Sequence, residues 1–264
     1  MFAAIARSAY LTRLRERSER LPPALFRLTT ALCIAWAGLF LMLAAFRVLA
    51  SPVSPEKFAD CLPILLPYLA IAVAPLAGYL LATAGFPRSF QPATLTLFPS
   101  LGVWRKLDPC EAQRHPLFGP AGFMASLLVG LLLNVVMRGV EFLMAVPAIS
   151  AGGPDWAQAL FLLAAGDVAV MSFVYMICFA MALRSIPLFP RLLAFAWLLD
   201  VFLQLFIAHS LGTIGDLPTA VGKPLGVVLF GNIQKVLISA FVWLPYLLLS
   251  DRANVTFRHR VSRD

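Results

Sequence analysis

The chain has 264 residues, of which 61% are hydrophobic and 13% are charged, and its formal net charge is +8. Soluble domains carry about 25% charged residues, so this composition excludes an ordinary soluble fold. A membrane-spanning helix needs about 20 mostly apolar residues, and several runs reach that length. The sequence therefore predicts an all-α, polytopic integral membrane protein in contact with the lipid bilayer. Its basic residues flank the apolar runs, which favours membrane topology over nucleic-acid binding as the source of the net charge.

The first element in chain order is a basic segment, residues 1–30, ahead of the first apolar run. Its long Arg-rich stretch and late apolar run do not fit a cleavable signal peptide. Ile5–Phe26 mixes apolar and Arg residues at loosely helical spacing. Two alternatives stay open for this segment: an amphipathic helix lying on anionic lipid at the cytoplasmic face, or a solvated basic arm.

Six apolar runs follow, and each is long enough to span a bilayer. The third is long enough to tilt or to begin as an interfacial helix. The expected spans are Ala31–Ala50, Leu62–Ala84, Phe118–Val146, Ala157–Leu183, Leu192–Leu211 and Leu225–Leu249. They divide the chain after the basic segment into a transmembrane hairpin (31–84), a loop (85–117), a four-helix region (118–257) and a basic tail (258–264).

The basic residues between these runs alternate between the two sides of the membrane. One side carries sixteen Lys and Arg residues, whereas the other carries only Lys57 and Lys223. The sixteen are Arg7, Arg13, Arg15, Arg17, Arg20, Arg27, Arg88, Arg105, Lys106, Arg114, Arg184, Arg191, Arg252, Arg258, Arg260 and Arg263. Because basic loops stay in the cytoplasm, we expect both termini to be cytoplasmic.

Residues 85–117 form the only long loop, on the predicted cytoplasmic side. It is rich in Pro and carries Phe90, Phe98 and Trp104. Loops of this length are uncommon unless they fold, dock or bind something. We expect Leu95–Trp104 to lie at the membrane interface, with its aromatic ring at the headgroup level. The loop is also a candidate docking surface for a protein partner.

Six charged side chains lie inside the apolar runs and present the main energetic problem of this sequence. An unpaired charge at mid-membrane costs roughly 2.5–3.5 kcal/mol, so these groups must be paired, hydrated or neutralised. They are Arg47, Arg138, Glu141, Asp167, Asp200 and Lys235. On the third span, Asn134, Arg138 and Glu141 are spaced by four and three residues and therefore share one helical face.

Pairing of these charges follows from the order of the spans. Asp200 and Lys235 lie on consecutive spans joined by a short loop, which usually neighbour each other, so we expect them to pair. Arg138 and Glu141 can pair within one helix. Two interpretations stay open, a closed ion-pair network and a wet opening toward the outside, and we favour closure. The candidate intramembrane cluster comprises Asn134, Arg138, Glu141, Asp167, Asp200, Gln204, Asn232 and Lys235.

Motifs for catalysis and for metal binding are absent from the sequence. It contains no HExxH, no GxSxG and no phosphate loop, and its three His and four Cys residues are dispersed. We therefore predict neither an enzyme nor a cofactor or metal site.

The end of the last span carries a family resemblance. It reads Trp243-Leu244-Pro245-Tyr246-Leu247, then Ser250-Asp251-Arg252 and, after three residues, Thr256-Phe257. This resembles the bacterial membrane-protein family catalogued as domain of unknown function 2569, whose last helix closes on Trp-x-Pro-Tyr, followed by Ser-x-Arg and Thr-Phe. The resemblance covers about residues 118–257. Asp251 departs from the basic residue that is usual there, and Gly122-Phe123 replaces the family's Gly-Trp opening.

The resemblance implies a small multi-pass protein of the bacterial inner membrane and no particular activity. Two functions are compatible with the sequence. The preferred one is an accessory or scaffold protein whose buried charge network holds the bundle together. The alternative is a small transporter or permeation unit that uses Arg138, Glu141, Asp167, Asp200 and Lys235 as an intramembrane site.

Overall fold

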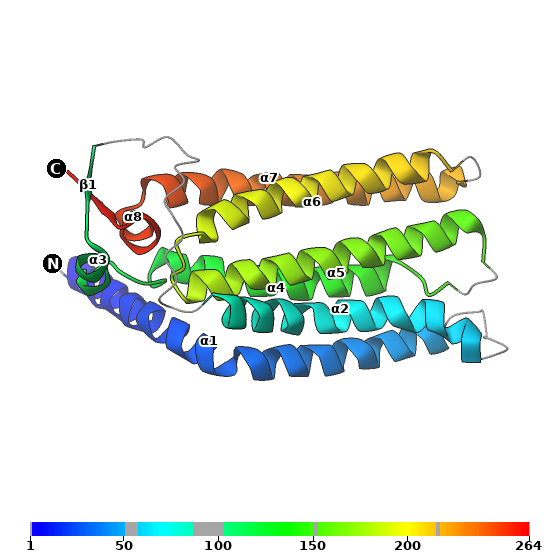
Figure 1. The fold of residues 1–264 in the computed structure, drawn as a ribbon, viewed down its shortest axis with the longest axis horizontal. Coiled ribbons are helices and arrows are strands. Elements are labelled where there is room, and N and C mark those ends of the chain that lie inside the picture. The colour runs from blue at the N-terminus through cyan, green and yellow to red at the C-terminus, as the bar shows by residue number, and fades with distance from the viewer. Residues whose placement is uncertain (1, 51–57, 87–102, 150–152, 215–216, 264) are drawn as a thin grey trace.

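The computed structural model describes residues 2–50, 58–86, 103–149, 153–214 and 217–263, with side chains from Arg20 in the first range and from Leu62 in the second. Six helices in these ranges are long and apolar enough to cross a membrane, in agreement with the six predicted spans (Figure 1). They are α1 (Phe2–Leu49), α2 (Phe58–Gly85), α4 (Phe123–Ala145), α5 (Asp155–Leu183), α6 (Phe189–Gly212) and α7 (Thr219–Leu249). The helical class is therefore confirmed.

The third long helix begins later than the sequence predicts, at Phe123 instead of Phe118. Gly119 and Gly122 both have positive φ angles, of 98° and 65°, which interrupt the backbone just before the helix. The chain therefore turns here, and the interfacial helical start that we considered for this span is absent from residues 118–122.

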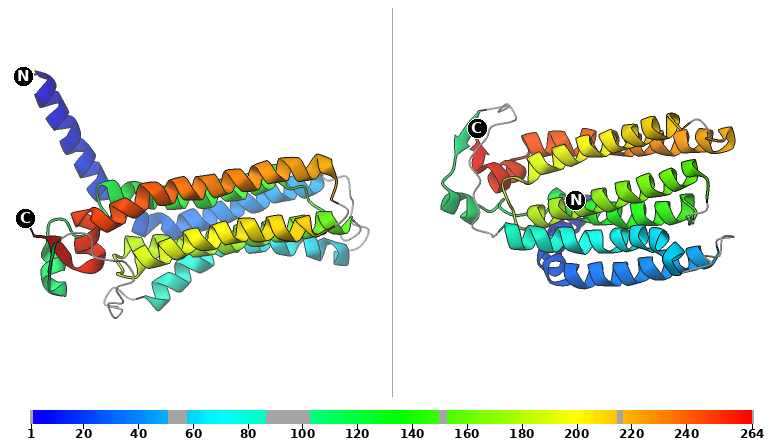
Figure 2. Two further views of the ribbon diagram at one scale, coloured as in Figure 1. Left: turned by 90° about the horizontal axis from the view of Figure 1, so that it is seen from above. Right: turned by 45° about the vertical axis from the view of Figure 1, so that its right-hand side comes forward.

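Helix α1 unites the basic N-terminal segment with the first span, because residues 2–49 form one continuous helix. Pro22 and Pro23 lie inside it. Figure 2 (left) shows the N-terminal part of α1 leaving the bundle at an angle. Proline lacks the backbone N–H and clashes with the preceding turn, so this pair accounts for a bend between the two parts. Whether the N-terminal part lies on anionic lipid stays a prediction.

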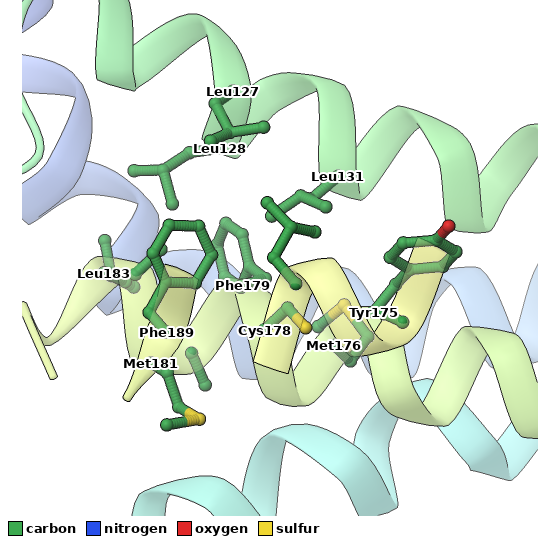
Figure 3. Close-up of a cluster of buried hydrophobic side chains, with 14 of the residues drawn as sticks. Leu127, Leu128, Leu131, Tyr175, Met176, Cys178, Phe179, Met181, Leu183 and Phe189 are labelled. Carbon is green, nitrogen blue, oxygen red and sulfur yellow. The ribbon is translucent and has the colours of Figure 1, made fainter. Parts of the chain in front are cut away.

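Helix α5 occupies the centre of the bundle, since it packs against α2, α4 and α6. It approaches α2 closely at Gly78, where an added Cβ atom would lie 2.4 Å from the backbone oxygen of Phe173. Figure 3 shows Leu128 and Leu131 of α4 facing Phe179 of α5 in the apolar core. Helix α7 packs mainly on α6 and directs much of its apolar surface outward. This leaves a seam between α4 and α7.

A small cap closes the end of the bundle at which both termini lie (Figure 1). It consists of β1 (Trp104–Lys106), α3 (Pro109–Arg114), α8 (Asp251–Arg258) and β2 (Arg260–Ser262). The strands are antiparallel, with Trp104 opposite Ser262. The second half of the predicted loop thus pairs with the predicted basic tail, and this pairing was not anticipated. The sequence gives little sign of it because three-residue strands carry almost no periodicity.

Two side chains hold the cap together. The buried Asn254 carboxamide donates to the carbonyls of Leu248 and Ser250 and accepts from Arg258 and Arg260. The Arg260 guanidinium also lies 4.7 Å from the ring centroid of Trp104, a residue that we expected at the headgroup level. Phe90, Phe98 and the rest of the predicted interfacial stretch, residues 95–102, lie outside the described residues.

Candidate functional site

Arg138 of α4 is the centre of the site, because its guanidinium binds one carboxylate on each of two other helices. Nη1 donates to Asp167 Oδ2 of α5 at 3.0 Å, and Nη2 donates to the carboxylate of Asp200 on α6. The Tyr175 hydroxyl donates to Asp200 Oδ2 at 2.8 Å. The side chains are nearly inaccessible, with exposed fractions of 10% for Arg138, 8% for Asp167 and 0% for Asp200. We call Arg138, Asp167 and Asp200 the buried triad.

The predicted pair between Asp200 and Lys235 is wrong. Lys235 Nζ of α7 lies 2.6 Å from Glu141 Oε1 of α4, so it bridges the seam instead. Asp200 instead binds Arg138 of α4 and Tyr175 of α5. Arg138 and Glu141, predicted to pair within α4, thus each bind a partner on a different helix.

Polar side chains connect the buried triad to the seam. Gln204 Nε2 donates to Asp167 Oδ1 at 3.1 Å, and Asn232 Nδ2 donates to Gln204 Oε1 at 3.2 Å. Lys235 Nζ donates to Asn232 Oδ1 at 3.4 Å. The network therefore runs from α4 through α5, α6 and α7 and returns to α4 at Glu141. We call this closed set of contacts the polar ring.

Tyr175 was not singled out from the sequence, and the structure places the candidate Asn134 beside the ring instead of within its hydrogen bonds. Tyr175 lies two helical turns after Asp167 on α5, a spacing that could have marked it as a neighbour of the network. In Figure 3 its hydroxyl points away from the apolar cluster. Asn134 lines a cavity one turn before Arg138 and makes none of the hydrogen bonds of the polar ring. Arg47 of α1 is not part of the ring and lines a separate cavity with Phe46.

Two cavities border the polar ring, one on the cap side of it and one on the far side. The cap-side cavity, of about 350 Å³, is lined by the α4 residues Leu127 to Glu141 and by residues such as Trp197 and Ser239. The far cavity, of about 800 Å³, is lined by the far end of α4 and by residues such as Trp156. Both cavities are bounded by the same side chains of the ring, which are Arg138, Glu141, Asn232 and Lys235.

The two buried carboxylates face different cavities. Asp200 lines the cap-side cavity and Asp167 lines the far cavity, whereas Arg138 lines both. The side chains of Lys235 and Glu141 are 61% and 41% exposed, so this pair lies at the open seam. The predicted closure thus holds for the buried triad, while the rest of the ring borders open space.

The seam between α4 and α7 is also bridged near the cap. The ring of Phe123 stacks on Trp243, with centroids 4.7 Å apart, and meets Tyr246 edge-on at 5.0 Å. Trp243 and Tyr246 therefore pack against α4, in addition to any anchoring at the interface. Between this aromatic contact and the Glu141–Lys235 pair, the cap-side cavity opens along the seam.

Among the described residues, no group of His, Cys, Asp and Glu is arranged to hold a metal ion. Comparison of the chain with protein-family models, curated proteins and solved structures finds no match. The resemblance of residues 118–257 therefore stays a proposal, and functional inference rests on the geometry of the site.

Proposed function

We propose that the protein is a small transport or permeation unit whose path leads through the polar ring. One observation carries this proposal: two cavities, one on each side of the polar ring along the bundle, are bounded by the same side chains of α4 and α7. Charged groups inside spanning helices commonly mark substrate or ion pathways. Alternating access requires a site near mid-depth that is reached from each side of the membrane in turn, and a cavity on each side of the ring fits that requirement.

A second candidate, an accessory or scaffold protein, is favoured by the buried triad. Arg138 joins three helices through ion pairs that exclude water almost completely. Removing one partner of such a group leaves a buried charge without compensation, so the triad fixes helix packing whatever else it does. A transport unit needs water in the two cavities, whereas a scaffold protein does not. The presence of water in the cavities therefore distinguishes the two candidate functions.

Orientation and location form a further part of the proposal. The described Lys and Arg residues outside the helix interiors gather at the cap end, including Arg105, Arg184 and Arg252, whereas Lys223 lies at the other end. We infer that the cap end is cytoplasmic, because basic segments are retained on that side. Anionic headgroups of a bacterial inner membrane would then meet this basic end. Residues 87–102, the main part of the candidate partner-docking loop, lie outside the described residues.

Cysteine accessibility in intact cells tests the proposal. In a variant without its native Cys residues, Ser239→Cys reports on the cap-side cavity and Val228→Cys on the far cavity. Phe241→Cys is the matched control, because its side chain is 82% exposed on α7 but lines neither of these cavities. A membrane-impermeant maleimide should label Val228→Cys from outside and Ser239→Cys only in inverted vesicles. It should not label Phe241→Cys in either preparation. Absence of labelling at both cavity positions would favour the scaffold.

A further inference from the structure

The buried triad carries more negative charge than positive charge. It contains one guanidinium and two carboxylates, so with all three groups ionised its formal charge is −1. The neighbouring pair, Glu141 and Lys235, sums to zero and is too exposed to serve as a buried counter-charge. The excess charge therefore lies where the exposed fractions of the side chains are 10% or less.

Other groups that face the triad do not supply the missing positive charge. Tyr175 from α5, Gln204 from α6 and Asn232 from α7 are neutral hydrogen-bonding partners. An isolated charge in such a dry place is costly, and buried groups usually neutralise instead. One bound monovalent cation would restore neutrality. The smallest is a proton, which a carboxylate oxygen binds directly without further ligands.

We propose that the triad binds one exchangeable proton, carried by Asp200 or by Asp167, and that the proton is the ion this site handles. The inference rests on the proposed transport function, since water in the cavities supplies and removes the proton. Asp200 borders the cap-side cavity and Asp167 the far cavity, so each cavity offers a route to one of the two carboxylates. In each exchange a hydronium O–H bond breaks and a carboxyl O–H bond forms, which leaves water and a neutral triad. Arg138 keeps its charge and pairs with the carboxylate that remains ionised.

Geometry makes the two carboxylates competitors for one guanidinium. Nη1 of Arg138 serves Asp167, and Nη2 serves Asp200. Protonation of one carboxylate weakens its ion pair with Arg138, so the guanidinium pairs mainly with the other carboxylate. That carboxylate is then stabilised in its ionised form, and binding of a second proton is disfavoured. The triad thus binds a single proton that is accessible from either cavity, depending on which carboxylate holds it.

Infrared spectroscopy of the purified full-length protein in lipid vesicles at neutral pH tests this inference. The wild type should show the carbonyl stretching band of a protonated carboxyl group, and this band should shift to lower frequency in D₂O. Asp167→Asn and Asp200→Asn each restore neutrality without a proton, so each variant should lose the band. Asp155→Asn, at the start of α5 and outside the ring, is the matched control and should keep it.

Tyr175→Phe provides a second readout that leaves the charges unchanged. It removes the hydroxyl that donates to Asp200, so the band should persist at a shifted frequency if Asp200 carries part of the proton. Absence of the band in the wild type overturns the proton site, as does its persistence in either Asn variant. Either result leaves the transport proposal standing if Ser239→Cys and Val228→Cys are labelled. If neither Ser239→Cys nor Val228→Cys is labelled while the infrared band is present, the transport proposal is wrong but the proton site stands.

Discussion

Replacing Arg138 with Met is the sharpest test of the buried triad. The substitution keeps much of the side-chain volume but removes the cation that compensates Asp167 and Asp200. Both carboxylates are at most 8% exposed and cannot turn to bulk water in place. Removing one partner of a buried ion pair costs about 3–5 kcal/mol, so we expect the free energy of unfolding to fall by about that amount.

The assay is reversible unfolding in mixed micelles with a chemical denaturant, followed by far-ultraviolet circular dichroism. Lys235→Met is the matched control, because its pair with Glu141 is 61% and 41% exposed. Because this pair borders the open seam, the Glu141 that is left can move toward the cavities, so this variant should lose less stability than Arg138→Met. Adding Asp167→Asn and Asp200→Asn to the Arg138 variant removes the uncompensated charges, so the combined variant should recover most of the lost stability.

One pattern of results would refute this reasoning. If Arg138→Met costs no more than Lys235→Met, the triad does not hold α4, α5 and α6 together. The same conclusion follows if the combined variant is no more stable than Arg138→Met alone, since the loss would then come from packing and not from charge.

Three further predictions concern the α2–α5 contact and the cap. Gly78→Ala should cost about 1–3 kcal/mol in thermal unfolding, because its Cβ would lie 2.4 Å from a backbone oxygen; Gly38→Ala, with nothing within 4 Å, should be nearly neutral. Asn254→Ala removes the buried carboxamide that joins the start of α8 to Arg260 of β2, the strand that pairs with β1, so trypsin should cleave after Arg105 faster than in the wild type, and an equal rate would contradict this. Burial lowers the pKa of His259 below its usual 6.5 despite the opposing charge of Asp108. The cap should therefore be most stable above about pH 6.5 and lose stability as the pH falls below that value. The rate of trypsin cleavage of the cap, measured at several pH values and normalised to a control peptide, tests this.

Much of the architecture is readable from the sequence, because a spanning helix is a local property of composition. Every predicted span corresponds to a long helix, although the first helix also takes in the basic N-terminal segment and begins at Phe2. The displacement at Phe123 has a local cause, the glycine conformations before it, which hydropathy does not report. The charged residues that must be paired or hydrated could likewise be identified from the sequence, because each lies within an apolar run and an unpaired charge is unfavourable in lipid.

Which charges meet was beyond the sequence. Arg138 lies 29 positions before Asp167 and 62 positions before Asp200 along the chain. Their meeting depends on the rotation of α4, α5 and α6 about their axes, which packing alone sets. Adjacency along the chain pointed to Lys235 as the partner of Asp200, but the side of α6 that carries Asp200 faces the centre of the bundle.

The sequence by itself determined a helical, multi-pass architecture and the polar residues that must avoid lipid, because both follow from the hydropathy of short segments. Only the tertiary structure decided that Arg138 lies between two carboxylates and that Asp200 and Asp167 face different cavities. It also decided that β1 pairs with β2 to form the cap. Each of these depends on contacts between distant segments, which the packing of whole helices fixes and no local pattern encodes.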